Sequence, residues 1–132
     1  MSSYEDLDIF KRGKSLFFDT YQISRKLPKF ELYELGSQIR RASDSVVTNI
    51  VEGYGRRRYK SEFIRFLIFS HASSIEIIFH LEKIETLYPE LSNSCNQLRL
   101  KYVELSKMIN KFIQFVEKNW KTYNLQLITY NR

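Results

Sequence analysis

The stretch from residue 60 to residue 88 is the feature that most constrains the fold. Between Phe63 and Phe79 only Arg65 and Glu76 carry a formal charge, while apolar residues recur at helical spacing. A helix that is apolar nearly all round has to be buried on more than one side. The stretch therefore predicts a long helix, and we expect contact between subunits to cover the side that one chain leaves open. Its two seams are Phe63, Leu67, Ser70, Ser74, Ile77, Leu81, Ile84 and Tyr88, and then Ile64, Ile68, Ile75 and Ile78.

A membrane span is the alternative explanation of this stretch. Arg65, His71 and Glu76, together with several serines, interrupt the ~20 apolar residues that a span requires. We therefore expect no membrane partner. The N-terminal residues are acidic where a signal peptide is basic, and the single Cys95 suits a reducing compartment, so we expect a cytoplasmic protein.

The rest of the chain predicts more long helices, because it contains only 2 prolines and 4 glycines. Pro28 is expected to end the first helix, since proline disfavours α conformation in the residue before it. Short connections make sequential helices antiparallel, so we predict an all-α fold, an up-down antiparallel four-helix bundle formed by a single domain, residues 1–132. The expected helices cover about 6–27, 32–53, 60–88 and 93–121, followed by a C-terminal tail at 122–132.

The second helix is expected to close at glycine. Gly53 and Gly55 are placed to supply the positive φ angles with which helices commonly stop. Within the same helix Ala42, Ser45 and Asn49 share a face of small side chains, which lets another helix approach closely. Asn49 on that face needs a hydrogen-bond partner, so we predict a structural role for it.

Positive charge is concentrated where the second helix gives way to the third. The segment from Gln38 to Leu67 contains seven Lys and Arg residues against three Asp and Glu, in a chain with net charge +6. Two interpretations remain open, a solvated basic turn and a phosphate-binding site, and Arg40 and Arg41 could instead pair with carboxylates across a subunit contact. The candidate nucleic-acid-binding residues are Arg40, Arg41, Arg56, Arg57, Arg58 and Lys60.

Residue patterns for catalysis or metal binding are missing from the sequence. His71 and His80 are nine positions apart without a cysteine cluster, and Cys95 has no identifiable base. The segment GYGRRR lacks the strand and spacing of a phosphate-binding glycine loop. We therefore predict no catalytic residue, no metal, no cofactor and no enzymatic activity.

The chain, over most of its length, resembles a family of small bacterial four-helix-bundle proteins, first noticed as products of intervening sequences inside large-subunit ribosomal RNA genes. The chain departs from the family's pattern at Val47, where a proline is common, and at Ala72, where a glycine is common. The residues that carry the resemblance are Pro28, Glu31, Gln38, Arg40, Arg41, Ala42, Ser45, Asn49, Ile50, Glu52, Gly53, Gly55 and Arg56, and then Glu62, Phe63, Phe66, Leu67, Ser73 and Glu76.

The resemblance implies a bundle that assembles with copies of itself, with a pentameric ring known among relatives. It marks Gln38, Ser45, Asn49, Glu52, Gly53 and Gly55 as a structural motif. A more distant similarity, to accessory proteins of diversity-generating retroelements, implies binding of nucleic acid through a basic surface. Two hypotheses follow: a homo-oligomeric structural or adaptor module, and an RNA- or DNA-binding accessory protein that uses the basic turn.

Overall fold

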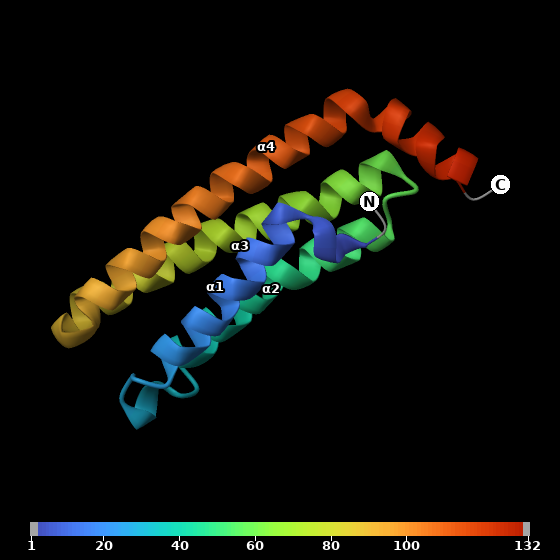
Figure 1. Cartoon of the computed structure of the whole chain (residues 1–132). Coiled ribbons are helices and arrows are strands. Elements are labelled where there is room, and N and C mark those ends of the chain that lie inside the picture. The colour runs from blue at the N-terminus through green and yellow to red at the C-terminus, as the bar shows by residue number, and fades with distance from the viewer. Residues whose placement is uncertain (1–2, 131–132) are drawn as a thin grey trace.

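The computed structural model shows an all-α bundle of four long helices that run up and down in sequence order (Figure 1). It describes residues 3–130, and the side chains of residues 3–119. The elements, with η for a short 3-10 helix, are η1 (Tyr4–Asp6), α1 (Asp8–Ser24), η2 (Lys29–Glu31), α2 (Leu35–Gly55), α3 (Lys60–Leu87), η3 (Pro89–Leu91) and α4 (Ser92–Tyr130).

The connection between α1 and α2 begins earlier and ends later than the sequence predicts. The α1 helix ends at Ser24, three residues before Leu27, because residues 25–27 already form a turn ahead of Pro28. The η2 turn then delays the start of α2 to Leu35. The helical part of α1 and α2 is therefore shorter at this end than the apolar spacing suggests.

Glu31 and Arg40 hold this connection in place. The Glu31 carboxylate is buried, accepts a hydrogen bond from the Tyr88 hydroxyl and lies 3.4 Å from the Leu35 backbone nitrogen. The Tyr88 hydrogen bond to this carboxylate is the largest of the causes that raise the pKa of Tyr88 to about 12. Arg40 Nη2 donates to the Leu32 carbonyl at 2.7 Å. Both ends of the connection are thus tied to the bundle through polar side chains.

Gly53 does not end α2, and the prediction of a positive φ there is wrong. The helix continues to Gly55, and no described glycine has a positive φ. Gly53 is buried against α3: a Cβ at this position would lie 3.1 Å from Phe66 Cβ and 3.3 Å from the Phe63 carbonyl oxygen. The position needs glycine because two helices approach closely, and Gly55 has open space around it.

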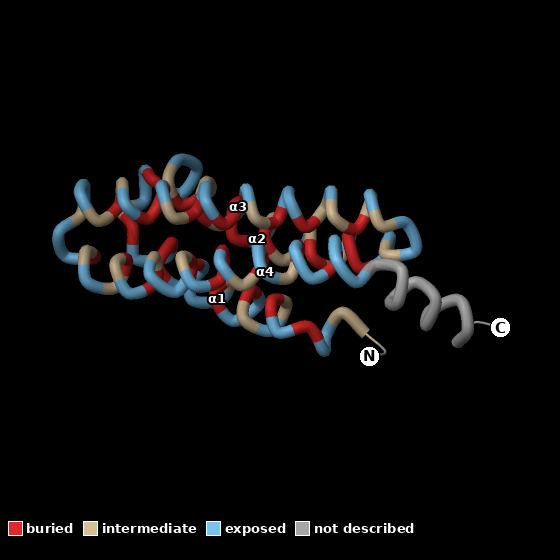
Figure 2. Tube along the Cα trace, turned by 90° about the horizontal axis from the view of Figure 1, so that it is seen from above, coloured by how far each residue is buried: buried red, intermediate tan, exposed pale blue. Residues whose placement is uncertain are grey.

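The helices pack in a square in which α1 and α3 are diagonal. The α1 helix packs on α2 and α4, and α3 also packs on α2 and α4. Figure 2 shows α3 along one edge of the bundle and α1 along the opposite edge, with buried positions between them. The outward faces of α1 and α3 therefore point to opposite sides of the molecule.

Most of the core is apolar, and its buried polar side chains include hydroxyl groups that pair with one another. Tyr102 of α4 is fully buried, and its hydroxyl lies 2.7 Å from Thr20 Oγ1 of α1. Burial is the main cause that raises the pKa of Tyr102. Thr20 Oγ1 also donates to the Leu16 carbonyl, so the buried hydroxyl pair has an acceptor.

At the C-terminus, α4 continues beyond the expected end near residue 121. Its backbone is helical to Tyr130, which includes most of the predicted tail, residues 122–132. The side chains from residue 120 onward, and residues 131–132 altogether, lie outside the described residues.

The α3 helix carries apolar residues on two sides, as its sequence predicts. One side packs on α2 and α4, and the opposite side carries a row that we call the outer stripe: Ile68, Ala72, Ile75 and Phe79, all exposed. Ile68 and Ile75 are each 50% exposed, and Phe79 is 58% exposed. By length and composition α3 could also cross a membrane, with a mean hydropathy of 1.3 over an 18-residue window of which 33% is buried. The buried side is explained by the bundle, whereas the outer stripe is left exposed by the single chain.

The close approach at Gly53 gives a test of the packing. We expect Gly53→Val to lower the free energy of unfolding by about 1–3 kcal/mol, because the new side chain collides with Phe66 and the Phe63 carbonyl. Gly55→Val is the matched control and should change it by less than about 0.5 kcal/mol. Urea unfolding measures both, and equal losses for the two variants would contradict the close approach.

Candidate functional site

A row of polar side chains fills the contact between α2 and α3, and we call it the α2–α3 seam. At its centre Ser45 Oγ of α2 lies 2.7 Å from Ser73 Oγ of α3. Asn49 Nδ2 donates to the Ser45 carbonyl and to Ser45 Oγ, each at 2.9 Å. Nearby, Ser70 Oγ donates to the Val46 carbonyl at 2.7 Å. These short side chains let the α3 backbone lie close to α2, and Asn49 has the structural contacts that its sequence position predicts.

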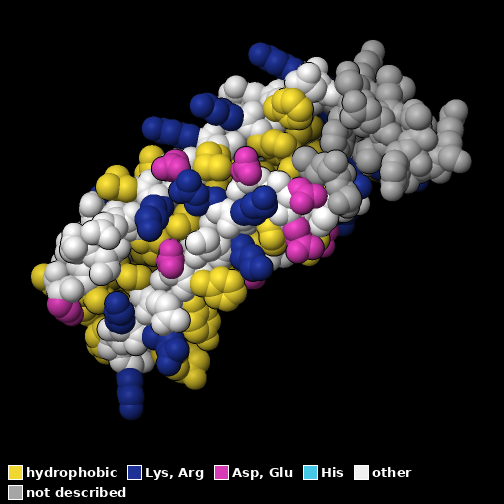
Figure 3. All heavy atoms as spheres, viewed as in Figure 1, with side chains coloured by type: hydrophobic (Ala, Val, Ile, Leu, Met, Phe, Trp, Pro, Cys, Tyr) yellow, Lys and Arg dark blue, Asp and Glu magenta, His cyan; other side chains and the backbone are white. Residues whose placement is uncertain are grey.

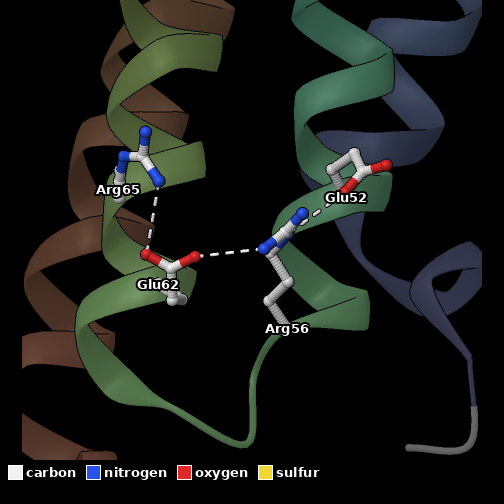
Figure 4. Close-up of polar contacts among 4 residues, drawn as sticks. All are labelled: Glu52, Arg56, Glu62 and Arg65. Atoms are coloured by element: carbon white, nitrogen blue, oxygen red, sulfur yellow. Dashed lines mark hydrogen bonds and ion pairs between the residues drawn. The ribbon is translucent and has the colours of Figure 1, made fainter.

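A chain of alternating charges continues the seam toward the basic turn (Figure 4). Arg56, just after α2, contacts Glu52 at 3.2 Å and Glu62 of α3 at 3.1 Å, and Glu62 contacts Arg65 at 3.4 Å. The Arg56 guanidinium also lies 4.7 Å from the centre of the Phe66 ring. These groups are largely exposed, so each pair stabilises the fold by at most about 1 kcal/mol. Because Arg56 lies between Glu52 and Glu62, these two carboxylates neutralise its positive charge within the chain.

The other end of the seam joins Gln38 to α3. Lys83 Nζ lies 3.4 Å from Gln38 Oε1, and His80 Nε2 lies 3.2 Å from Glu76 Oε2. His80 is buried, and its Nδ1 has no hydrogen-bond partner among the described residues. A single histidine–carboxylate contact supplies no nucleophile, so the arrangement orders the helix surface and defines no catalytic centre.

Four of the six predicted nucleic-acid-binding residues are occupied within the chain. Arg40 holds the Leu32 carbonyl, and Arg56 lies between two glutamates. The Arg57 guanidinium stacks 3.9 Å from the centre of the Tyr54 ring, and Nη1 donates to the Tyr54 carbonyl at 2.9 Å. Lys60 Nζ donates to the Glu117 carbonyl of α4 at 2.9 Å. The cations of the basic turn therefore mainly make contacts within the chain, at the ends of the helices.

The remaining two candidates, Arg41 and Arg58, face solvent. Both are exposed, and neither has a hydrogen bond, ion pair or ring contact with a described residue. They project from different turns of the α2 region, one near its middle and one just beyond its end. The structure thus does not bring the six cations together into one pocket for phosphate.

Several contributors to the seam are not identified from sequence as site residues. Ser73, Glu76, His80 and Lys83 lie on α3, and their alignment with α2 depends on how the two helices are rotated about their axes. The family pattern includes Ser73 and Glu76, which is the one signal that pointed to them. The sequence of α3 alone does not predict which of its polar residues contact α2 and which are exposed to solvent.

Cys95 and the acidic and histidine residues give no reactive centre. Burial, the largest cause, raises the pKa of Cys95 to about 11, so the thiol stays protonated at neutral pH. Within the described part of the chain, no group of three or more His, Cys, Asp and Glu side chains is placed to hold a metal ion. The contacts that these described residues make serve the packing of the helices.

The fold and the α2–α3 seam define a class: up-down four-helix bundles in which polar side chains fix the contact between the two central helices. Residues 5–111 match the family of the 23S rRNA-intervening sequence protein, and the chain belongs to this family. The resemblance predicted from the sequence is thereby confirmed. No curated protein matches the chain.

Proposed function

We propose that the protein is a non-enzymatic, homo-oligomeric helical bundle that acts as a structural or adaptor module. The observation that carries this proposal is the outer stripe of α3, which exposes three large apolar side chains in a row at the spacing of a helix contact. Exposed apolar residues at such spacing are typical of a surface that another helix covers. The family resemblance favours five copies, arranged as a ring.

The size of the stripe indicates how the assembly forms. Complete burial of one such side chain contributes about 1.5–3 kcal/mol, and these are already about half buried. Association itself costs on the order of 4–15 kcal/mol, so the stripe alone does not hold two copies together. A closed ring overcomes this cost because each copy makes two contacts, one with each neighbour. In each contact the surface of the neighbour that covers the stripe also buries apolar area of its own.

Binding of RNA or DNA is the second candidate function. Arg41 and Arg58 support it, because they are exposed, carry no intramolecular partner and would be repeated in every copy of an oligomer. Several weak phosphate contacts held together raise avidity by about 10²–10⁴ when all can bind at once. The occupied state of Arg40, Arg56, Arg57 and Lys60 favours the structural role as the first candidate.

The oligomer proposal predicts that Ile75→Asp dissociates the protein, because the variant places a charge in the covered stripe. Thr48→Asp adds the same charge on the exposed face of α2 and should leave the assembly intact. Light scattering coupled to size exclusion at micromolar concentration measures both masses. A monomeric wild type would refute the homo-oligomer, and a stable dimer or tetramer would refute only the ring of five.

The nucleic-acid candidate predicts that Arg41→Ala combined with Arg58→Ala weakens binding of a single-stranded oligonucleotide. The plot of log affinity against log salt should flatten by about 1.4 for each copy that contacts the strand, since each copy loses two phosphate contacts at about 0.7 apiece. Lys107→Ala combined with Lys111→Ala removes equal charge from the exposed face of α4 and is the control. An unchanged slope, or no binding by the wild type at low salt, would remove this candidate.

A further inference from the structure

The outward face of α1 carries a second row of exposed side chains, which we call the α1 ridge: Lys14, Phe18, Tyr21 and Arg25. Phe18 is 55% exposed and Tyr21 is 45% exposed. The ridge repeats the spacing of the outer stripe, because positions 14, 18, 21 and 25 are separated by the same steps as 68, 72, 75 and 79. Two helices with rows at this spacing can pack with the side chains of one between those of the other.

The ridge and the stripe lie on opposite sides of one molecule, because α1 and α3 are diagonal in the bundle (Figure 2). They therefore cannot satisfy each other within one copy. In the view of Figure 3, hydrophobic side chains stand among Lys and Arg side chains on the exposed surface. Two different surfaces on opposite sides are the arrangement that head-to-tail association requires.

The two rows also lie at the same height along the bundle. Gly13 of α1 packs on Val47 and Val46, since a Cβ there would be 3.4 Å from Val47 Cγ2 and 3.9 Å from Val46 Cγ1, and Ser70 Oγ of α3 donates to the Val46 carbonyl. Gly13 and Ser70 are therefore level, and α1 and α3 run in the same direction (Figure 1). Phe18 and Ile75 each lie five residues further along, a rise of about 7.5 Å in both helices.

The charged residues at the end of the ridge and at the end of the stripe also lie at the same height along the bundle. Arg25 and Glu82 each lie twelve residues beyond the level pair, at about 18 Å. Both are exposed, and neither side chain has a hydrogen bond or ion pair with a described residue, although the Glu82 charge contributes to the raised pKa of Arg99. Lys14 and Arg25 make the α1 ridge basic, while Glu82 and Glu76 beside the stripe are exposed and acidic. Opposite charges thus meet if ridge and stripe are placed against each other without a shift along the helix axis.

We propose that the α1 ridge of one copy packs on the α3 outer stripe of the next. Phe18 and Tyr21 contact Ala72, Ile75 and Phe79, with the small Ala72 making room for a ring, and Arg25 faces Glu82. The inference rests on the proposed homo-oligomer and specifies its contact. Equal height is the condition for a ring whose axis is parallel to the helices, because an axial shift at each contact would produce an open helical filament.

Two variants distinguish this contact from a symmetric α3–α3 contact. Phe18→Asp damages only the ridge, and Ile75→Asp damages only the stripe. For the head-to-tail contact, each variant alone is a monomer, because a ring needs an intact ridge and an intact stripe on every copy. For a symmetric α3–α3 contact, Phe18→Asp still assembles and only Ile75→Asp is a monomer. Light scattering measures the masses, and circular dichroism checks that both variants are folded. Thr48→Asp is the control for the added charge.

The outcomes separate the inference from the proposed function on which it depends. A Phe18→Asp variant that assembles like the wild type overturns the ridge–stripe contact while the homo-oligomer stands. A monomeric wild type overturns both. If either aspartate variant fails to fold, the charge pair serves instead: Arg25→Glu and Glu82→Arg should each weaken assembly, and the double variant should restore it. A double variant no better than the single ones also overturns the contact.

Discussion

Small side chains along the α2–α3 contact determine the rest of the architecture. Gly53 leaves no room for a Cβ beside Phe66, and Ser70 reaches the Val46 carbonyl of the neighbouring helix. The Ser45–Ser73 hydrogen bond, flanked by Asn49, allows only a narrow range of rotation of α3 about its axis. Once that rotation is fixed, one apolar side of α3 is in the core and the other faces outward.

The outward apolar side links the fold to its proposed function. A helix that served only the core of one bundle would carry polar residues where α3 carries its outer stripe. The stripe and the α1 ridge expose apolar side chains in an isolated copy, and the proposed association would cover both. The polar seam contributes in another way, because paired polar groups fix one alignment of α2 and α3 and so keep the stripe in a constant position.

The sequence predicts the bundle well because helical periodicity and the scarcity of proline and glycine act locally. It does not predict the role of Gly53, since a helix-ending glycine and a glycine at a helix crossing look alike without the partner helix. The basic residues show the same limit. Arg57 and Lys60 look available for phosphate until the fold supplies the Tyr54 ring and the Glu117 carbonyl. Asn49 could be predicted to need a hydrogen-bond partner because its amide lies on the small-residue face of α2, and the part-buried amide donates to Ser45 of the same helix.

Thiol labelling tests most directly whether the outer stripe is covered by another copy. Cys95 is buried and its pKa is raised to about 11, so a cysteine introduced elsewhere is the only reactive thiol among the described residues. Ile75→Cys should react with a maleimide much more slowly than Thr48→Cys at micromolar concentration, and the two rates should converge on dilution below the dissociation constant of the assembly. Equal rates at every concentration would show that α3 faces solvent and would contradict the account.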